Sequence, residues 1–259
     1  MLLNDRYGGR LLVEMKKSAW GLNSFVLHLL AMALMLADHL WAIGVPFDLL
    51  TWMGRLAFPL FAFMLVEGYF HTRDLKKYLL RLLLTALISE IPFNLLCSGS
   101  LVYPLHQNVI WSFLISIICI RLIERVRRRE KMWLTALASV CISVPGFLLG
   151  TITMVDYYGY GILIVLMFYF LHGRRWYCFV GQAVLLWYIT WEMMGGLVVP
   201  MEILGWKFEL SQQGMSMLAL IPIWLYNGRR GPHNRWIRYS FYAFYPLHML
   251  ILGLVQLLF

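Results

Sequence analysis

The sequence predicts an all-α protein, a polytopic helical bundle with about nine transmembrane helices. Hydrophobic residues make up 61% of the 259 residues, and the mean hydropathy is +0.71. A chain with so little polar surface cannot cover a water-soluble globule of this size. The apolar residues also gather in runs of about 20, the length that a helix needs to cross the hydrocarbon core of a bilayer.

These runs fall at roughly 22–43, 50–70, 76–97, 107–124, 132–151, 157–173, 176–194, 212–227 and 238–258. The first follows a basic stretch but is longer than the hydrophobic region of a signal peptide, and no small-residue cleavage site follows it. We therefore expect it to be a retained helix. Residues 195–211 mix Gly, Pro, Trp and charged residues, which predicts a short helix lying in the membrane interface. No long polar linker divides the chain, so we expect residues 1–259 to form a single domain.

The basic residues predict an orientation for these runs. Of 22 Lys and Arg residues, all but Arg55 and Lys207 precede the first run or lie in or beside every second connection after it. By the positive-inside rule, the N-terminus is then cytoplasmic and the C-terminus, after nine spans, is external. This pattern also accounts for the net charge of +9. We therefore expect no nucleic-acid partner.

Ionisable residues inside the apolar runs point to a functional site, because each costs free energy in hydrocarbon. Asp38 and His39 lie in the first run, Arg55 in the second, and Glu90 with Asn94 in the third. Most of these residues fall towards the predicted external side of the membrane. A purely structural ion-pair network would produce the same pattern.

Two histidines of the first run share one face of the predicted helix. Eleven positions separate His28 from His39, which returns them to nearly the same azimuth about 16 Å apart. Asp38 can orient the imidazole of His39 and raise its basicity, as carboxylates beside histidines do. Adjacent helical residues point about 100° apart, however, so Asp38 can instead pair with Arg55. Both pairings keep His39 near charge.

The residues from Gly54 to Asn94 read GRLAFPLFAFMLVEGYFHTRDLKKYLLRLLLTALISEIPFN, and this run resembles the signature of the TraX family. That family consists of polytopic bacterial membrane proteins and takes its name from the pilin acetylase of conjugative plasmids. Further matches follow in the same order along the chain: Asp38-His39, Gln107-Asn108, Asp156-Tyr157, Tyr226-Asn227-Gly228 and FYAFYPLHML from Phe241 to Leu250. More distantly, the chain is similar to transmembrane acyltransferases such as the lysosomal heparan-glucosaminide N-acetyltransferases.

The resemblance implies a multi-pass protein of the bacterial cytoplasmic membrane that moves an acetyl or acyl group from cytosolic acetyl-CoA to an external acceptor. The acceptor, an amine or hydroxyl of a pilin-like protein, a glycan or a small molecule, is not identified by the sequence. Acyl transfer needs a base for the acceptor proton and hydrogen-bond donors for the developing oxyanion. No metal is needed, and Cys97, Cys119, Cys141 and Cys178 lack metal-binding spacing.

The expected roles divide the polar residues into three groups. Catalysis is expected of His39 as general base, supported by Asp38, Arg55, Glu90 and Asn94. Donor binding is expected of His28, Glu67, His71, Arg73, Lys76, Lys77 and Arg81, whose basic members suit the nucleotide phosphates. Acceptor or oxyanion contacts are expected of Gln107, Asn108, Asp156, Tyr157, Tyr242, Tyr245 and His248.

Other functions remain open at this point. A transporter or flippase would also place ionisable residues inside the membrane, although no inverted repeat is visible in the sequence. A non-enzymatic assembly factor for an exported subunit would need no base. Within the acyltransferase interpretation, direct transfer through His39 is simpler than a covalent acetyl-histidine relay that uses both His28 and His39.

Overall fold

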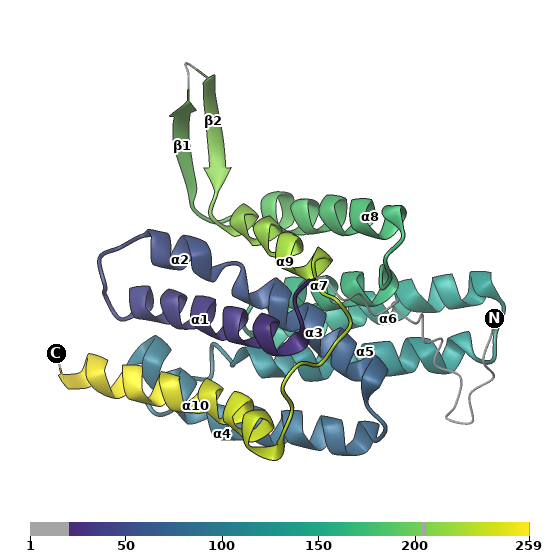
Figure 1. The fold of residues 1–259 in the computed structure, drawn as a ribbon, viewed down its shortest axis with the longest axis horizontal. Coiled ribbons are helices and arrows are strands. Elements are labelled where there is room, and N and C mark those ends of the chain that lie inside the picture. Colours follow the sequence, from purple (N-terminus) through teal and green to yellow (C-terminus); the bar gives the residue numbers. More distant parts are fainter. Residues whose placement is uncertain (1–20, 204–205, 259) are drawn as a thin grey trace.

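The structure, a computed structural model, describes residues 21–203 and 206–258, and for residues 201–203 and 206–208 it describes the backbone alone. The described chain is helical apart from one two-stranded hairpin (Figure 1). The elements are α1 Ser24–Ala42, α2 Leu49–Gly54, α3 Ala57–His71, α4 Leu75–Ser98, α5 Val109–Arg127, α6 Met132–Ile152, α7 Tyr158–Phe170, α8 Trp176–Trp187, a π-helix Tyr188–Met193, β1 Val198–Ile203, β2 Trp206–Ser211, a 3₁₀-helix Gln213–Ala219, α9 Leu220–Trp224 and α10 Arg235–Leu258.

Five helical stretches in the described residues are long and apolar enough to cross a membrane: Ser24–Ala42, Leu49–His71, Leu75–Ser98, Met132–Ile152 and Arg235–Leu258. The chain is thus a membrane protein with several apolar helices, and the expected count of about nine spans is not confirmed. The other four predicted runs form shorter or more charged helices. For example, α7 has 13 residues, and α5 carries Arg121, Glu124 and Arg125 within its last turns.

The second predicted run is two helices rather than one. Helix α2 ends at Gly54 and α3 begins at Ala57, so the helical conformation is interrupted at Arg55 and Leu56. Pro59 lies in the first turn of α3, where its missing N–H has no intrahelical partner to lose. At Gly54 an added Cβ would lie 2.3 Å from Cβ of Asp38, so the missing side chain lets α2 approach α1 closely.

The prediction of a short interfacial helix at residues 195–211 is wrong. Instead, this connection forms an antiparallel hairpin, in which Val198 pairs with Ser211 and Ile203 with Trp206. Gly195 and Gly196 have φ of +64° and +107°, a backbone conformation that ends the preceding helix. β-branched residues such as Val198 and Val199 then favour a strand. The hairpin projects away from the helices (Figure 1).

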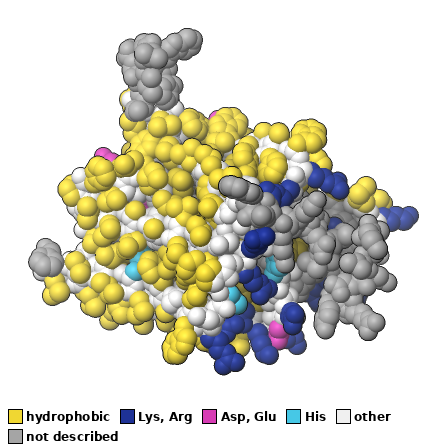
Figure 2. Space-filling view, viewed as in Figure 1, with side chains coloured by type: hydrophobic (Ala, Val, Ile, Leu, Met, Phe, Trp, Pro, Cys, Tyr) yellow, Lys and Arg dark blue, Asp and Glu magenta, His cyan; other side chains and the backbone are white. Residues whose placement is uncertain are grey.

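Helix α3 lies at the centre of the bundle and has 12 buried residues among its 15. It packs against α1 and α7, whereas α6 contacts α5 and α7 and leaves most of its apolar side chains exposed, as a lipid-facing helix does. Much of the visible surface is hydrophobic, and Lys and Arg side chains gather towards one end (Figure 2). The basic residues Arg6, Arg10, Lys16 and Lys17 lie outside the described residues.

Candidate functional site

Two histidines from opposite ends of the sequence meet between α1 and α10. Nδ1 of His39 lies 2.8 Å from Nε2 of His248, within hydrogen-bond distance. Nδ1 of His248 lies 2.6 Å from the carbonyl oxygen of Phe244, one helical turn earlier, and must donate to it. From the sequence, His248 was expected to contact the acceptor. Its pairing with His39 was not predicted.

Asp38 does not orient His39. Its Oδ1 accepts hydrogen bonds from Nη2 of Arg55 at 2.9 Å and from Oγ1 of Thr51 at 2.7 Å. Gln212, at the base of the hairpin, donates to Thr51 at 3.2 Å. The alternative pairing of Asp38 with Arg55 is therefore correct, because the 100° step along α1 turns Asp38 towards α2 and His39 towards α10. We call Asp38, Thr51, Arg55 and Gln212 the Asp38 network.

Glu90 holds a second cluster of polar side chains between α4 and α5. Its Oε2 accepts hydrogen bonds from Nδ2 of Asn108 and from Nε1 of Trp111, the latter at 3.0 Å. Asn108 is completely buried, donates also to the carbonyl of Ala86, and caps α5 through the amide of Ile110. Both amide hydrogens of Asn108 are thus used, which leaves it no donor for an oxyanion.

Asn94 and the remaining residues expected at the acceptor site have several different partners. Gln107 donates to the carbonyl of Pro104, and Asn94 lies within α4 and donates to the carbonyl of Leu101. Tyr157 stacks on Phe58 with ring centres 4.1 Å apart. Tyr242 and Tyr245 line the large cavity described below. The backbone amide of Asp156 donates to the carbonyl of Gln107 at 2.8 Å, so these two predicted acceptor residues lie side by side.

Asp156 pairs with a histidine that the sequence analysis did not single out. Its Oδ1 lies 3.4 Å from Nε2 of His106 in the connection before α5. The hydrogen bond that His106 donates to the carboxylate of Asp156 raises the pKa of His106 above its ordinary value, against the opposing effect of burial. Asp156 also acts electrostatically on Arg55 and His39.

A cavity of about 1090 Å³ extends along α1 and α10. One end, which we call the basic end, is lined by Arg73, Arg81, Arg229, Arg230 and Arg238. The other end is lined by apolar and aromatic side chains that include Met35, Val109, Phe244 and Tyr245. Met35 and Phe244 each lie one helical turn before a member of the histidine pair, so the apolar end of the cavity leads towards His39 and His248.

The residues expected to bind the donor are only partly those that line this cavity. His28, Glu67, His71, Arg73 and Arg81 line it. Lys76 and Lys77 are not among the lining residues, and Lys77 is 76% exposed and pairs with Asp74. In the sequence analysis, Arg229, Arg230 and Arg238 served only to predict the orientation of the helices. Their clustering around the start of the last apolar run could also have indicated that they belong to the basic end of the cavity.

Two arginine donors at this cavity have no partner within the described part of the chain. They are the buried Nε atoms of Arg81 and Arg238. A buried N–H without an acceptor is costly, and a phosphate supplies acceptors for such donors. Close by, Oε1 of the buried Glu67 lies 2.5 Å from Nε2 of His172. The cavity lining thus includes a glutamate that contacts a histidine and whose Oε2 has no hydrogen-bond partner in the described residues, as well as guanidinium groups suited to an anion.

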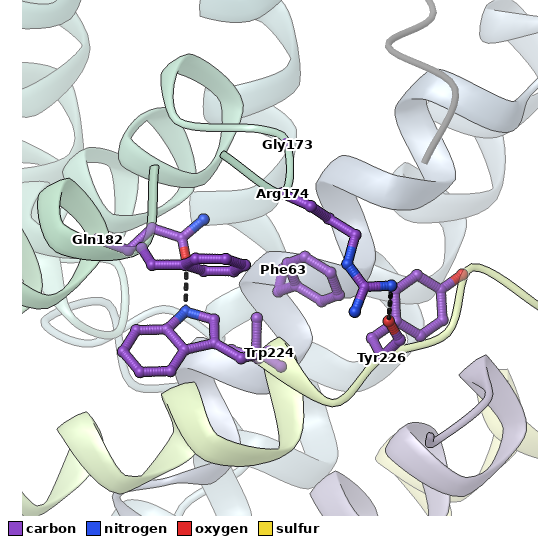
Figure 3. Close-up of a pocket in the computed structure, with 8 residues that line it drawn as sticks. Phe63, Gly173, Arg174, Gln182, Trp224 and Tyr226 are labelled. Atoms are coloured by element: carbon purple, nitrogen blue, oxygen red, sulfur yellow. Dashed lines mark hydrogen bonds between the residues drawn. The ribbon is translucent and has the colours of Figure 1, made fainter. Parts of the chain in front are cut away.

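A second cavity of about 20 Å³ lies between α3, α8 and α9 (Figure 3). There Nε1 of Trp224 donates to Oε1 of Gln182 at 2.8 Å, and Arg174 donates to the carbonyl of Tyr226 at 3.3 Å. This volume holds about one water molecule and is too small for a substrate. As for metals, the described residues contain no group of three or more His, Cys, Asp or Glu side chains placed to share an ion.

The sequence model of one protein family, described as TraX protein, matches residues 24–256. This match covers both members of the histidine pair, the Asp38 network and all residues that line the large cavity. The chain belongs to the TraX family. The resemblance inferred from the Gly54–Asn94 run is therefore confirmed.

A curated relative of this TraX family member is the probable fimbrial assembly protein FimC, serogroup H1, of Dichelobacter nodosus. The two are 27% identical over 229 residues, which cover 85% of this chain and 86% of the relative. No solved structure matches the chain. Family membership and the name of this relative indicate a pilin-related membrane function.

Proposed function

We propose that this protein is a membrane-embedded acyltransferase that moves an acetyl group from cytosolic acetyl-CoA to an amine or hydroxyl at the external side. The observation that carries this proposal is the cavity, which has arginines at its basic end and is also lined by Met35 and Phe244, each one helical turn from a member of the histidine pair. A phosphorylated donor with a long thin arm suits a cavity with cations at one end and apolar walls at the other.

The proposed reaction is a direct transfer of the acyl group. The nucleophilic nitrogen or oxygen of the acceptor attacks the thioester carbonyl, and a bond forms between it and the acyl carbon. The carbon–sulfur bond breaks, and the proton of the acceptor passes to Nε2 of His39 and then to the leaving thiolate. A positioned base of this kind contributes about 10² to 10⁴ in rate. The products are the acylated acceptor and the free thiol.

The proposal includes an orientation. The N-terminus is cytoplasmic, the chain crosses the bacterial cytoplasmic membrane about nine times, and the basic end faces the cytosol, as the distribution of Lys and Arg supports. In a cysteine-free background, a cysteine placed at Arg128 should resist an impermeant thiol reagent added from outside, and one at Leu197 should react. The reverse pattern would put the basic end on the wrong side for a cytosolic donor.

Donor binding tests the chemistry directly. In purified protein, acetyl-CoA binding should weaken as salt screens the arginines of the basic end. Arg81→Ala removes a charged donor at the cavity, and such a loss costs about 1.5 to 3 kcal/mol, or roughly 10- to 100-fold in affinity. Lys77→Ala is the matched control, since Lys77 lies on the same helix outside the cavity lining. Equal effects of the two changes would contradict a specific site.

A second function is favoured by the name of the relative, which describes fimbrial assembly and no enzyme. A non-enzymatic assembly factor would bind an exported subunit without acyl-CoA. Mixing purified protein with acetyl-CoA and a primary amine separates the two functions. Release of thiol together with acylated amine supports the enzyme, whereas absence of both donor binding and turnover supports the assembly factor.

A further inference from the structure

The contact between the two histidines is an in-line hydrogen bond. Their ring planes differ by 5° and their ring centres lie 5.0 Å apart. An imidazole nitrogen lies about 1.1 Å from its ring centre, so two rings joined end to end by a 2.8 Å hydrogen bond have centres about 5 Å apart. The rings are therefore nearly coplanar and joined edge to edge, and they do not overlap face to face.

The partners of the pair determine which nitrogen carries each proton. A carbonyl oxygen only accepts, so Nδ1 of His248 must donate to Phe244. Neutral His248 then has an unprotonated Nε2, which accepts the hydrogen bond from His39. His39 must therefore carry its proton on Nδ1, and its Nε2 has a free lone pair. In the described part of the chain this Nε2 has no hydrogen-bond partner.

We propose that His248 is the positioning residue of the transfer reaction, which holds His39 in the tautomer and ring orientation that present Nε2 to the acceptor. This inference rests on the proposed acyltransferase function. When Nε2 of His39 takes the acceptor proton, the hydrogen bond from Nδ1 becomes charge-assisted and stabilises the imidazolium. No proton leaves Nδ1 during the cycle, and His248 stays neutral throughout.

The surroundings of His248 suit a supporting role and exclude it as the base. Both of its ring nitrogens are engaged, one with Phe244 and one with His39, so neither has a lone pair for a substrate. The residue is 6% exposed, and the ring of Phe244 lies over it at 4.5 Å. A rigid, buried acceptor of this kind fixes the orientation of its partner, as a carboxylate does in a catalytic triad.

Substitutions that keep or remove the acceptor test this role in the full-length protein. His248→Phe keeps a planar ring but removes the acceptor, and kcat should fall by about 10²-fold or more while the KM for acetyl-CoA stays within about twofold. His248→Gln offers an amide oxygen to Nδ1 of His39 and should recover at least about a tenth of the lost rate. The control is Leu247→Phe, which adds a ring at a 54% exposed neighbour on α10 and should leave kcat unchanged.

The tautomers themselves give a readout that does not depend on turnover. In ¹⁵N-histidine spectra of the unmodified protein, His248 should be protonated on Nδ1 and His39 unprotonated on Nε2, and His248→Phe should abolish the preference at His39. An unchanged kcat in His248→Phe would overturn the proposal, and so would the opposite tautomer at His39 or a lack of rescue by Gln in folded protein. If the tautomers are as expected and no acyl transfer occurs, the proposed function fails and the assignment of the pair stands.

Discussion

The Asp38 network and the basic end of the cavity differ in whether their arginines are paired with a carboxylate. Nη2 of Arg55 donates hydrogen bonds to both Asp38 and Thr51, so this group has its partners within the protein. The Nε atoms of Arg55, Arg81 and Arg238 all lack an acceptor in the described residues, but of the three only Arg55 forms an ion pair there, and Arg81 and Arg238 line the cavity. Paired charges position neighbouring groups, whereas unpaired cations in a cavity are suited to a ligand that brings its own negative charge. The comparison predicts effects on turnover and stability in one region and on donor affinity in the other.

The largest effect is expected at the histidine pair beside the Asp38 network. His39→Ala removes the base and should lower the transfer rate by about 10² to 10⁴ while donor binding is retained. His28→Ala, at the cavity, should instead raise the KM for acetyl-CoA and leave most of kcat. Steady-state kinetics of both variants check the contrast. Equal loss of kcat at the two positions would favour an acetyl-histidine relay over direct transfer.

Breaking the Asp38 network should cost stability rather than affinity. Arg55→Ala leaves the carboxylate of Asp38 without its cation, and breaking a buried pair costs about 3 to 5 kcal/mol. The two side chains are 18% and 23% exposed, so we expect the lower end of that range. Unfolding of the purified protein by denaturant measures the loss. The double variant Arg55→Met, Asp38→Asn should recover part of it, and a stable single variant would show that the pair is well hydrated.

A smaller loss is expected where α1 and α2 touch. Gly54→Ala would place Cβ 2.3 Å from Cβ and 2.7 Å from Oδ1 of Asp38, so one helix must shift. Overpacking of this kind costs about 1 to 3 kcal/mol. The same unfolding measurement should show it, together with slower turnover because Asp38 moves. Met53→Ala, at a 37% exposed neighbour, is the control and should change stability little.

The smallest effect is expected at the His106–Asp156 pair, where the side chains are 33% and 32% exposed. Because the pKa of His106 is raised in the folded protein, the pair contributes its full stability below the unfolded pKa of about 6.5. That contribution is lost as pH rises through the folded pKa. NMR titration should show the pKa of His106 falling back towards its ordinary value in Asp156→Asn. An unchanged titration would mean that Asp156 does not act on His106.

The sequence alone determined the class of protein, its family and the helix ends that carry charge. Apolar runs of membrane length and basic residues on alternate connections are properties of the chain itself, since each depends on a residue's neighbours within a few turns. The azimuth of His28 and His39 was likewise readable, because an α-helix has a fixed period. The hairpin at 195–211 was not predicted, because the mixture of apolar and charged residues was interpreted as an interfacial helix and the β-branched Val198 and Val199 were not considered.

The partners of these residues were decided only by tertiary structure. His39 meets His248 across 209 positions of sequence, and Asp38 chooses Arg55 over its own neighbour. The cavity draws arginines from α4, α10 and the connection before α10 into one place. Helical periodicity gives the direction of a side chain about its own axis, but which helix lies in that direction depends on packing between distant segments. The physical reason is that contacts across the bundle carry no local signature in the chain.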